Sequence, residues 1–158
     1  MSTAKPVPEG MIGVIPHLTV KGAARAIEYY TKVFGATELA RFGMPDGSIM
    51  HATLKLGGGT LMLNDEFKDM GCVSPQSMGG TPVYLMLYVP DVDATFKRAV
   101  DAGAEVKMPV ADQFWGDRYG LLVDPFGHYW EIATHKEDLT KEEMDRRGRE
   151  AMSQMAKK

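Results

Sequence analysis

The residues best suited to chemistry are one carboxylate and two histidines, each on a predicted strand. Glu131 follows a tight turn at residues 124–127 and lies among bulky apolar neighbours in the predicted strand 129–134. His17 and His51 lie in two other predicted strands. Two histidines and a carboxylate form a ligand set that suits iron or zinc. These residue types therefore allow a metal site at His17, His51 and Glu131.

Two other interpretations of Glu131 need no metal. The carboxylate could pair with Arg118 or accept a hydrogen bond from Tyr84, which would satisfy a polar group inside the fold. It could also orient a bound ligand or act as a general base, which makes Glu131 the single candidate catalytic residue. The sequence alone leaves the three interpretations open.

Two copies of one unit are predicted to position these residues. A shift of 69 residues places segment 14–20 on segment 83–89, and segment 58–63 on segment 127–132. Each copy has the periodicity of a strand, a helix and three further strands. The predicted elements are strand 13–20, helix 23–34 and strands 38–42, 48–56 and 60–64, then strand 83–89, a helix from about 91 to 103, and strands 106–110, 118–123 and 129–134. The fold class is therefore α+β, with two tandem βαβββ modules.

The segments between and after the modules differ in composition from the modules themselves. Residues 67–82 are rich in Gly, Ser, Met and Pro without a clear period, which predicts a linker. Residues 140–143 have the spacing of a capping box and predict a C-terminal helix. This helix could be a solvated tail or an arm that clasps a second copy. The predicted parts are a flexible leader at 1–10, modules at 11–66 and 83–135, the linker between them, and a helix and tail at 136–158.

Each predicted strand has one apolar face and one mixed face, because side chains alternate across a strand. The apolar faces must pack against the helices, whereas the mixed faces are too rich in Tyr and Met to be simply solvated. We therefore expect the mixed faces to line a ligand cavity. His128 and His135 are expected to face solvent. The predicted lining residues are His17, His51, Met62, Asn64, Tyr84, Trp115, Arg118 and Glu131.

Composition and charge exclude several classes of protein. The 158 residues are 44% hydrophobic and 25% charged, which is typical of a globular protein. The net charge of −3 gives no basic footprint for nucleic acid or an anionic membrane surface, and no apolar run is long enough to span a bilayer. A single Cys72 cannot form an internal disulfide. We expect a cytoplasmic protein that binds neither nucleic acid nor membranes.

Several motifs resemble those of the vicinal oxygen chelate superfamily, which includes glyoxalase I, bleomycin-resistance proteins and extradiol dioxygenases. The motifs are Ala26-Ile27-Glu28-Tyr29-Tyr30 before Val33-Phe34-Gly35-Ala36, Val89-Pro90-Asp91-Val92-Asp93, and Asp124-Pro125-Phe126-Gly127 before Trp130-Glu131-Ile132. Other segments, such as Leu61-Met62-Leu63-Asn64-Asp65, are most similar to the PhnB-like branch. The resemblance implies two sheets that curl into U-shaped half-barrels around a cavity, two metal-ligand positions in each module, and a homodimer.

The four metal-ligand positions that the resemblance implies match Ile15, Met62, Tyr84 and Glu131 in this sequence. Only Glu131 keeps a usual ligand, so we expect a protein that binds a small, partly apolar or aromatic molecule without the usual metal site or any cofactor. The alternative is a metal-dependent lyase, isomerase or dioxygenase that uses a divalent metal at His17, His51 and Glu131. A third possibility is an interaction module whose inner face is covered by another protein.

Overall fold

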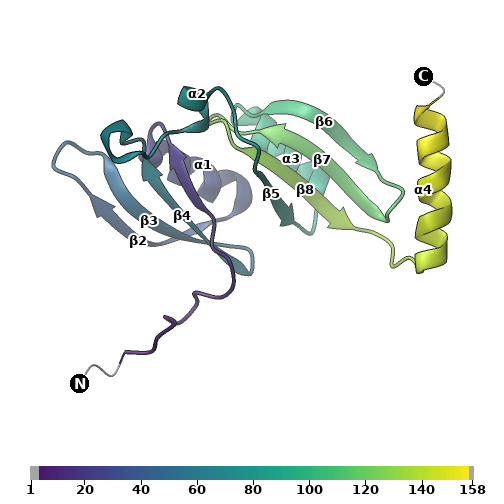
Figure 1. Cartoon of the computed structure of the whole chain (residues 1–158), viewed down its shortest axis with the longest axis horizontal. Coiled ribbons are helices and arrows are strands. Elements are labelled where there is room, and N and C mark those ends of the chain that lie inside the picture. The colour runs from purple at the N-terminus through teal and green to yellow at the C-terminus, as the bar shows by residue number, and fades with distance from the viewer. Residues whose placement is uncertain (1–3, 157–158) are drawn as a thin grey trace. The chain divides into compact units, whose positions relative to one another are not determined.

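The computed structural model describes residues 4–156 and divides the chain into two compact units (Figure 1). The first unit contains the chain up to Val83 together with Asp124–His128, and the second contains Tyr84–Val123 together with the chain from Tyr129 onward. Each unit has a four-stranded sheet and a helix that follows its first strand. Both predicted modules are therefore present.

The first unit has the sheet order β1-β4-β3-β2, in which β1 and β4 are parallel and the other pairs antiparallel. One face of the helix α1 is buried because Ala26, Tyr30 and Val33 recur at helical spacing. The elements are β1 (His17–Val20), α1 (Ala23–Phe34), β2 (Thr37–Gly43), β3 (Ile49–Leu56), β4 (Gly59–Asp65), η1 (Lys68–Met70) and α2 (Pro75–Met78).

The second unit repeats this order as β5-β8-β7-β6, with β5 and β8 parallel. Trp130, Ile132 and Leu122 are buried on the face of the sheet that α3 covers. The elements are β5 (Tyr84–Tyr88), α3 (Val92–Asp101), β6 (Glu105–Asp112), β7 (Asp117–Val123), β8 (Tyr129–His135) and α4 (Lys141–Met155). The α+β class, the tandem βαβββ modules and the C-terminal helix are thus confirmed.

The C-terminal helix α4 starts at the predicted capping box and packs on its own unit. The Thr140 hydroxyl accepts a hydrogen bond from the Glu143 N–H at 3.2 Å. Gly148 is buried, and a β-carbon at this position would lie 3.3 Å from the Phe114 ring. The helix is therefore held against the loop before β7 at Gly148. No helix among the described residues combines the length and apolarity needed to cross a membrane.

In each module, a side chain of the last strand caps the start of the helix, and the two capping residues occupy equivalent positions in the repeat. The Asp65 carboxylate accepts hydrogen bonds from the N–H groups of Gly22 at 2.9 Å and Ala23 at 2.8 Å, at the start of α1. Thr134, 69 residues further along the chain, accepts a hydrogen bond from the Val92 N–H at 2.8 Å, at the start of α3. A side-chain oxygen here satisfies backbone donors that the helix leaves unpaired.

Replacing Asp65 with alanine is expected to destabilise the protein by about 1–2 kcal/mol, the usual cost of losing a helix cap. Asp65 also accepts a hydrogen bond from the Ile49 N–H at 2.7 Å, so the substitution leaves donors in both α1 and β3 without their acceptor. Urea denaturation followed by circular dichroism measures the change. Asp69→Ala, at an exposed carboxylate, is the matched control, and equal stability of the two variants would contradict the capping role.

One expectation about local structure was wrong, and the predicted linker is more ordered than its composition suggests. Strand β1 begins at His17 and not at residue 13, because Pro16 has no N–H to donate to a ladder. Segment 67–82 contains η1 and α2, and Glu66 holds it in place by accepting hydrogen bonds from the Ser74 N–H at 2.7 Å and the Ser77 hydroxyl at 3.0 Å. The sequence of this segment has no helical period because both helices are very short.

The turn Asp124–His128 belongs to the first unit although it lies between two strands of the second. The Asp124 carboxylate accepts hydrogen bonds from the Tyr30 hydroxyl at 2.7 Å and the N–H groups of Phe126 and His128 at 2.9 and 3.0 Å. His128 is only 8% exposed, and its Nε2 lies 3.1 Å from the Thr19 carbonyl oxygen. The expectation that His128 faces solvent was therefore wrong, because the turn packs against the first unit.

Candidate functional site

One face of the second unit's sheet carries a concentration of aromatic side chains. Register pairs Tyr84 of β5 with Tyr129 of β8, and Met86 with Glu131. Since alternate residues share a face, these side chains lie opposite the face that α3 covers. We call this set the aromatic face, and it comprises Tyr84, Met86, Tyr88, Trp115, Asp117, Tyr119, Tyr129 and Glu131.

Aromatic side chains on this face contact one another, and several remain open to solvent. The Tyr84 and Tyr129 ring centroids lie 4.9 Å apart, and those of Trp115 and Tyr119 lie 5.7 Å apart. Tyr84 is 50% exposed and Tyr88 is 58% exposed. Exposed aromatic surface of this kind is typical of binding sites.

Glu131 is the carboxylate at the centre of the aromatic face. The Tyr119 hydroxyl donates a hydrogen bond to Glu131 Oε1 at 2.8 Å. Burial, and then this hydrogen bond, raise the pKa of Tyr119, so its hydroxyl keeps its proton. Glu131 thus accepts a hydrogen bond, as one interpretation predicted, but the donor is Tyr119 and not Tyr84 or Arg118. A carboxylate offers about four acceptor positions, which leaves Glu131 capacity for a ligand donor.

Asp117 holds three side chains at the edge of the aromatic face. This carboxylate is 4% exposed and accepts hydrogen bonds from the Tyr88 hydroxyl at 2.8 Å and Trp115 Nε1 at 3.2 Å. His135 Nδ1 lies 2.7 Å from its other oxygen. Burial acts to raise the pKa of Asp117, but the hydrogen bonds from His135 and Tyr88 outweigh it and lower the pKa. Asp117 therefore fixes the positions of two aromatic residues.

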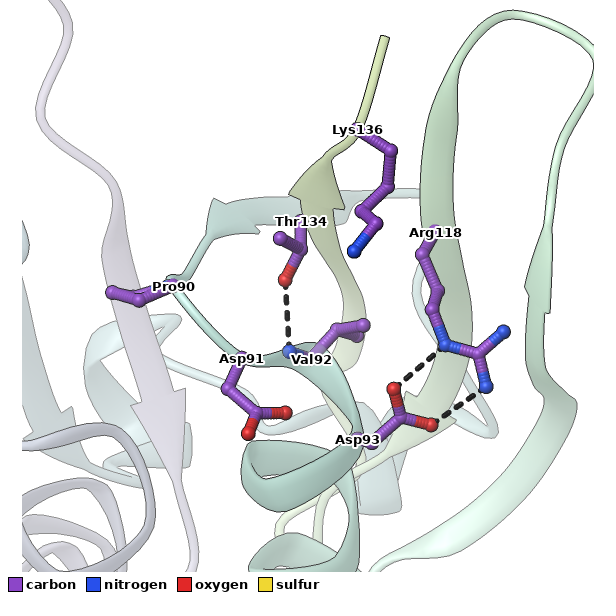
Figure 2. Close-up of a pocket in the computed structure, with 7 residues that line it drawn as sticks. All are labelled: Pro90, Asp91, Val92, Asp93, Arg118, Thr134 and Lys136. Carbon is purple, nitrogen blue, oxygen red and sulfur yellow. Dashed lines mark hydrogen bonds and ion pairs between the residues drawn. The ribbon is translucent and has the colours of Figure 1, made fainter.

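Arg118 lies on the side of β7 that faces away from the aromatic face. The prediction that Arg118 lines the mixed face was therefore wrong. Nε and Nη2 of Arg118 donate to the Asp93 carboxylate at 2.6 and 2.7 Å (Figure 2). Its Nη1 donates to Asp112 at 3.1 Å. These hydrogen bonds raise the pKa of Arg118. Arg118 shares this side with Gly120, which lies against Phe96 of α3.

The pocket beside Arg118 has a volume of about 280 Å³ and lies at the start of α3 (Figure 2). Its two cationic side chains, Arg118 and Lys136, are matched by Asp91 and Asp93. Arg118 is already engaged by Asp93 through two hydrogen bonds, as Figure 2 shows. The pocket therefore offers no excess of charge for an anionic ligand.

In the first unit, the face of the sheet opposite α1 carries His17, Met62, Asn64 and His51. Register pairs His17 of β1 with Met62 of β4. The ring centroids of His17 and His51 lie 5.3 Å apart, with the ring planes perpendicular. Burial, and then the neighbouring His51, lower the pKa of His17, which keeps its imidazole neutral near pH 7. The structure thus brings together these four predicted residues of one module.

The four positions that correspond to superfamily metal ligands do not fit a hard divalent cation. Ile15 and Met62 offer no oxygen or nitrogen ligand, and the Tyr84 hydroxyl would have to lose its proton. Among the four residues, only Glu131 has oxygen atoms suited to bind such a cation. The described residues contain no group of three or more His, Cys, Asp or Glu placed to hold a metal ion. His17 and His51 lie together in the first unit, whereas Glu131 lies in the second.

Two residues of the aromatic face, Asp117 and Tyr119, were missed by sequence reasoning. They alternate with Arg118, which was assigned to the mixed face of its strand. If Arg118 had been assigned to the other face of its strand, Asp117 and Tyr119 would have been predicted to lie on the same face as Glu131. The signal that could have done so is Gly120, because a glycine beside a bulky helix residue marks the side of a strand that the helix covers.

Two tandem βαβββ units with a mixed sheet in each define a protein of the vicinal oxygen chelate class. The family model of the Glyoxalase/Bleomycin resistance protein/Dioxygenase superfamily matches residues 12–132, and the chain belongs to this superfamily. The resemblance found in the sequence motifs is therefore confirmed.

Several relatives and solved structures are similar to the chain. The uncharacterized protein Mb0911c of Mycobacterium bovis is 48% identical over 132 residues, which cover 82% of this chain and 87% of the relative. The crystal structure of TioX from Micromonospora sp. ML1 has 32% identity and a TM-score of 0.62, with 78% of this chain and 98% of TioX covered. A PhnB protein from Bacillus cereus shares the fold at 20% identity and a TM-score of 0.59, over 78% of this chain and 99% of its own.

Proposed function

We propose that this protein binds a small, partly aromatic molecule on the aromatic face, without metal-dependent chemistry. The observation that carries the proposal is the set of Tyr and Trp side chains gathered on one open sheet face around Glu131. Aromatic rings bind planar ligands by stacking and edge-to-face contacts, each worth about 0.5–1.5 kcal/mol beyond the area they bury. The superfamily's description includes bleomycin resistance proteins, which supports a binding role.

The charges on the face indicate which ligands fit best. Glu131 and Asp117 are acceptors, and the exposed rings of Tyr84 and Tyr88 attract cations to their faces. A ligand with an aromatic ring and an N–H donor, such as an aromatic amine, would use both features. Glu131 would then orient the ligand by accepting its hydrogen bond, and the Tyr119 hydroxyl would hold the carboxylate in position.

Replacing Glu131 with glutamine or Tyr84 with alanine is expected to weaken ligand binding at least tenfold. A hydrogen bond to a charged group contributes about 1.5–3 kcal/mol, and removal of a central aromatic anchor costs a similar amount. A thermal-shift screen of aromatic amines and drugs first identifies a ligand, since binding to the folded state raises its melting temperature. Quenching of the tryptophan fluorescence, to which Trp115 contributes together with the buried Trp130, then measures the affinity of each variant.

Matched controls separate this site from the rest of the surface. Glu105→Gln removes an exposed carboxylate, and Phe42→Ala removes an aromatic side chain that is 62% exposed in the first unit. Both controls should bind the ligand like the parent protein. The proposal fails if the screened aromatic ligands bind equally well to Glu131→Gln and Tyr84→Ala, or if none of them raises the melting temperature.

The alternative function, a metal-dependent enzyme that uses His17, His51 and Glu131, is favoured only by the proximity of the two histidine rings. Metal analysis of protein purified without chelator tests it. Stoichiometric iron, zinc, nickel or manganese that is lost in Glu131→Gln would replace the binding proposal with the enzymatic one. We also propose a homodimer, which sedimentation analysis tests directly.

A further inference from the structure

A second set of potential ligands lies in the first unit, and it combines two imidazoles with a thioether. His17, Met62 and His51 come from β1, β4 and β3, which are neighbours in that order in the sheet. Met62 lies opposite His17 in the register, and β4 separates the two strands that carry the histidines. All three side chains therefore project from the same face.

The two imidazole rings lean toward each other across the central strand. Strands that are both neighbours of β4 lie about 9.5 Å apart, twice the usual spacing. The ring centroids of His17 and His51 are nevertheless only 5.3 Å apart. Metal–nitrogen bonds of about 2.0–2.1 Å place a metal about 3.2 Å from each ring centroid, so two ligands at roughly 110–120° have centroids about 5–5.5 Å apart. The observed separation fits a shared metal ion.

Buried polar side chains orient both rings. Thr53 is 5% exposed, and its hydroxyl oxygen lies 3.0 Å from His51 Nε2. Asn64 is 5% exposed, and its side chain lies close enough to His17 to influence the imidazole. Each partner can engage one ring nitrogen and leave the other to a ligand, as the supporting hydrogen bonds of metal-binding histidines usually do.

We propose that His17, His51 and Met62 form a copper(I) site. A thioether is a soft ligand that selects copper(I) over zinc, magnesium or manganese, and imidazole also suits copper. Three ligands from adjacent strands give the low coordination number that copper(I) accepts. The site uses neither Glu131 nor the aromatic face, so it is independent of the proposed function.

Anaerobic competition against a chromophoric copper(I) chelator tests the site in the full-length chain. Cys72 is partly exposed and could itself bind copper(I), so all proteins carry Cys72→Ala. This parent is expected to hold one copper(I) per chain. His17→Ala, His51→Ala and Met62→Leu should each weaken copper(I) binding at least tenfold, whereas Met152→Leu, at an exposed methionine of α4, should not.

The conservative Met62→Leu variant keeps a side chain of similar volume, and X-ray absorption spectroscopy checks its effect directly. A sulfur scatterer should be present in the parent and absent in Met62→Leu. The proposal is overturned if the parent holds no copper(I) against the chelator. It is equally overturned if the three variants bind copper(I) as tightly as the parent, or if the sulfur scatterer persists without Met62.

Discussion

Replacing Asp124 with alanine is expected to lower the free energy of unfolding by about 3–5 kcal/mol, the usual cost of breaking a buried polar network. Asp124 is buried and accepts hydrogen bonds from the Tyr30 hydroxyl and from the N–H groups of Phe126 and His128. Alanine removes this acceptor and leaves a cavity beside Tyr30, which is fully buried. Urea denaturation at neutral pH measures the loss.

A double-mutant cycle isolates the contact between the two side chains. Tyr30→Phe removes only the hydroxyl and should cost about 1–2 kcal/mol, since the ring keeps its packing. The double variant Tyr30→Phe with Asp124→Ala should then be less destabilised than the sum of the single variants, because the contact is lost only once. Strict additivity would show that the hydrogen bond contributes nothing to stability.

Replacing Asp117 with asparagine is expected to cost about 2–4 kcal/mol, because this buried carboxylate accepts charge-assisted hydrogen bonds from Tyr88, Trp115 and His135. Asparagine keeps the shape but presents an NH2 group to donors on at least one side. Trp115 should become less ordered, so the anisotropy of the tryptophan fluorescence should fall, and the buried Trp130 should contribute a constant background. Asp69→Asn, at an exposed carboxylate of η1, is the control.

The same network predicts how stability depends on pH. Hydrogen bonds to Asp117, and then to Asp138, raise the pKa of His135 above its ordinary value of 6.5. A histidine whose pKa is raised in the folded state contributes to stability fully below pH 6.5. This contribution is lost as the pH rises through the raised pKa. Asp117 has its pKa lowered from 3.8, so its contribution is present above that value and is lost as the pH falls through the lowered one.

The stability difference between the parent and His135→Gln should therefore be largest at about pH 5 and should shrink toward about pH 9. Denaturation series across this range test the expectation. A difference that stays constant with pH would show that His135 does not change its charge against Asp117.

Much of the fold was predictable from the sequence, because the apolar periods and the internal repeat both reflect burial. Helices α1 and α3 start at Ala23 and Val92, within a residue or so of the predicted positions, and the strands alternate as expected. The shared face of His17, Met62 and His51 also followed from alternation. It was harder to predict which face of the sheet each residue of β7 occupies, because the long Arg118 side chain is compatible with either face.

The details that were missed depend on contacts between distant residues. Nothing in the local sequence of the turn 124–128 indicates that Asp124 meets Tyr30, 94 residues earlier. Similarly, Glu66 orders the segment after it through Ser74 and Ser77, and such a contact is not visible as a period. Tyr119, rather than a cation, became the partner of Glu131 because it lies diagonally across the β7–β8 ladder.

The place of Asp124–His128 in the first unit also bears on the order in which the protein can fold during translation. A ribosome releases the chain from its N-terminus, and early domains generally fold before later ones emerge. Here the first unit cannot bury the Tyr30 hydroxyl against Asp124 until β5, α3, β6 and β7 have been synthesised. The nascent first unit therefore lacks this buried hydrogen bond while most of the second unit is synthesised.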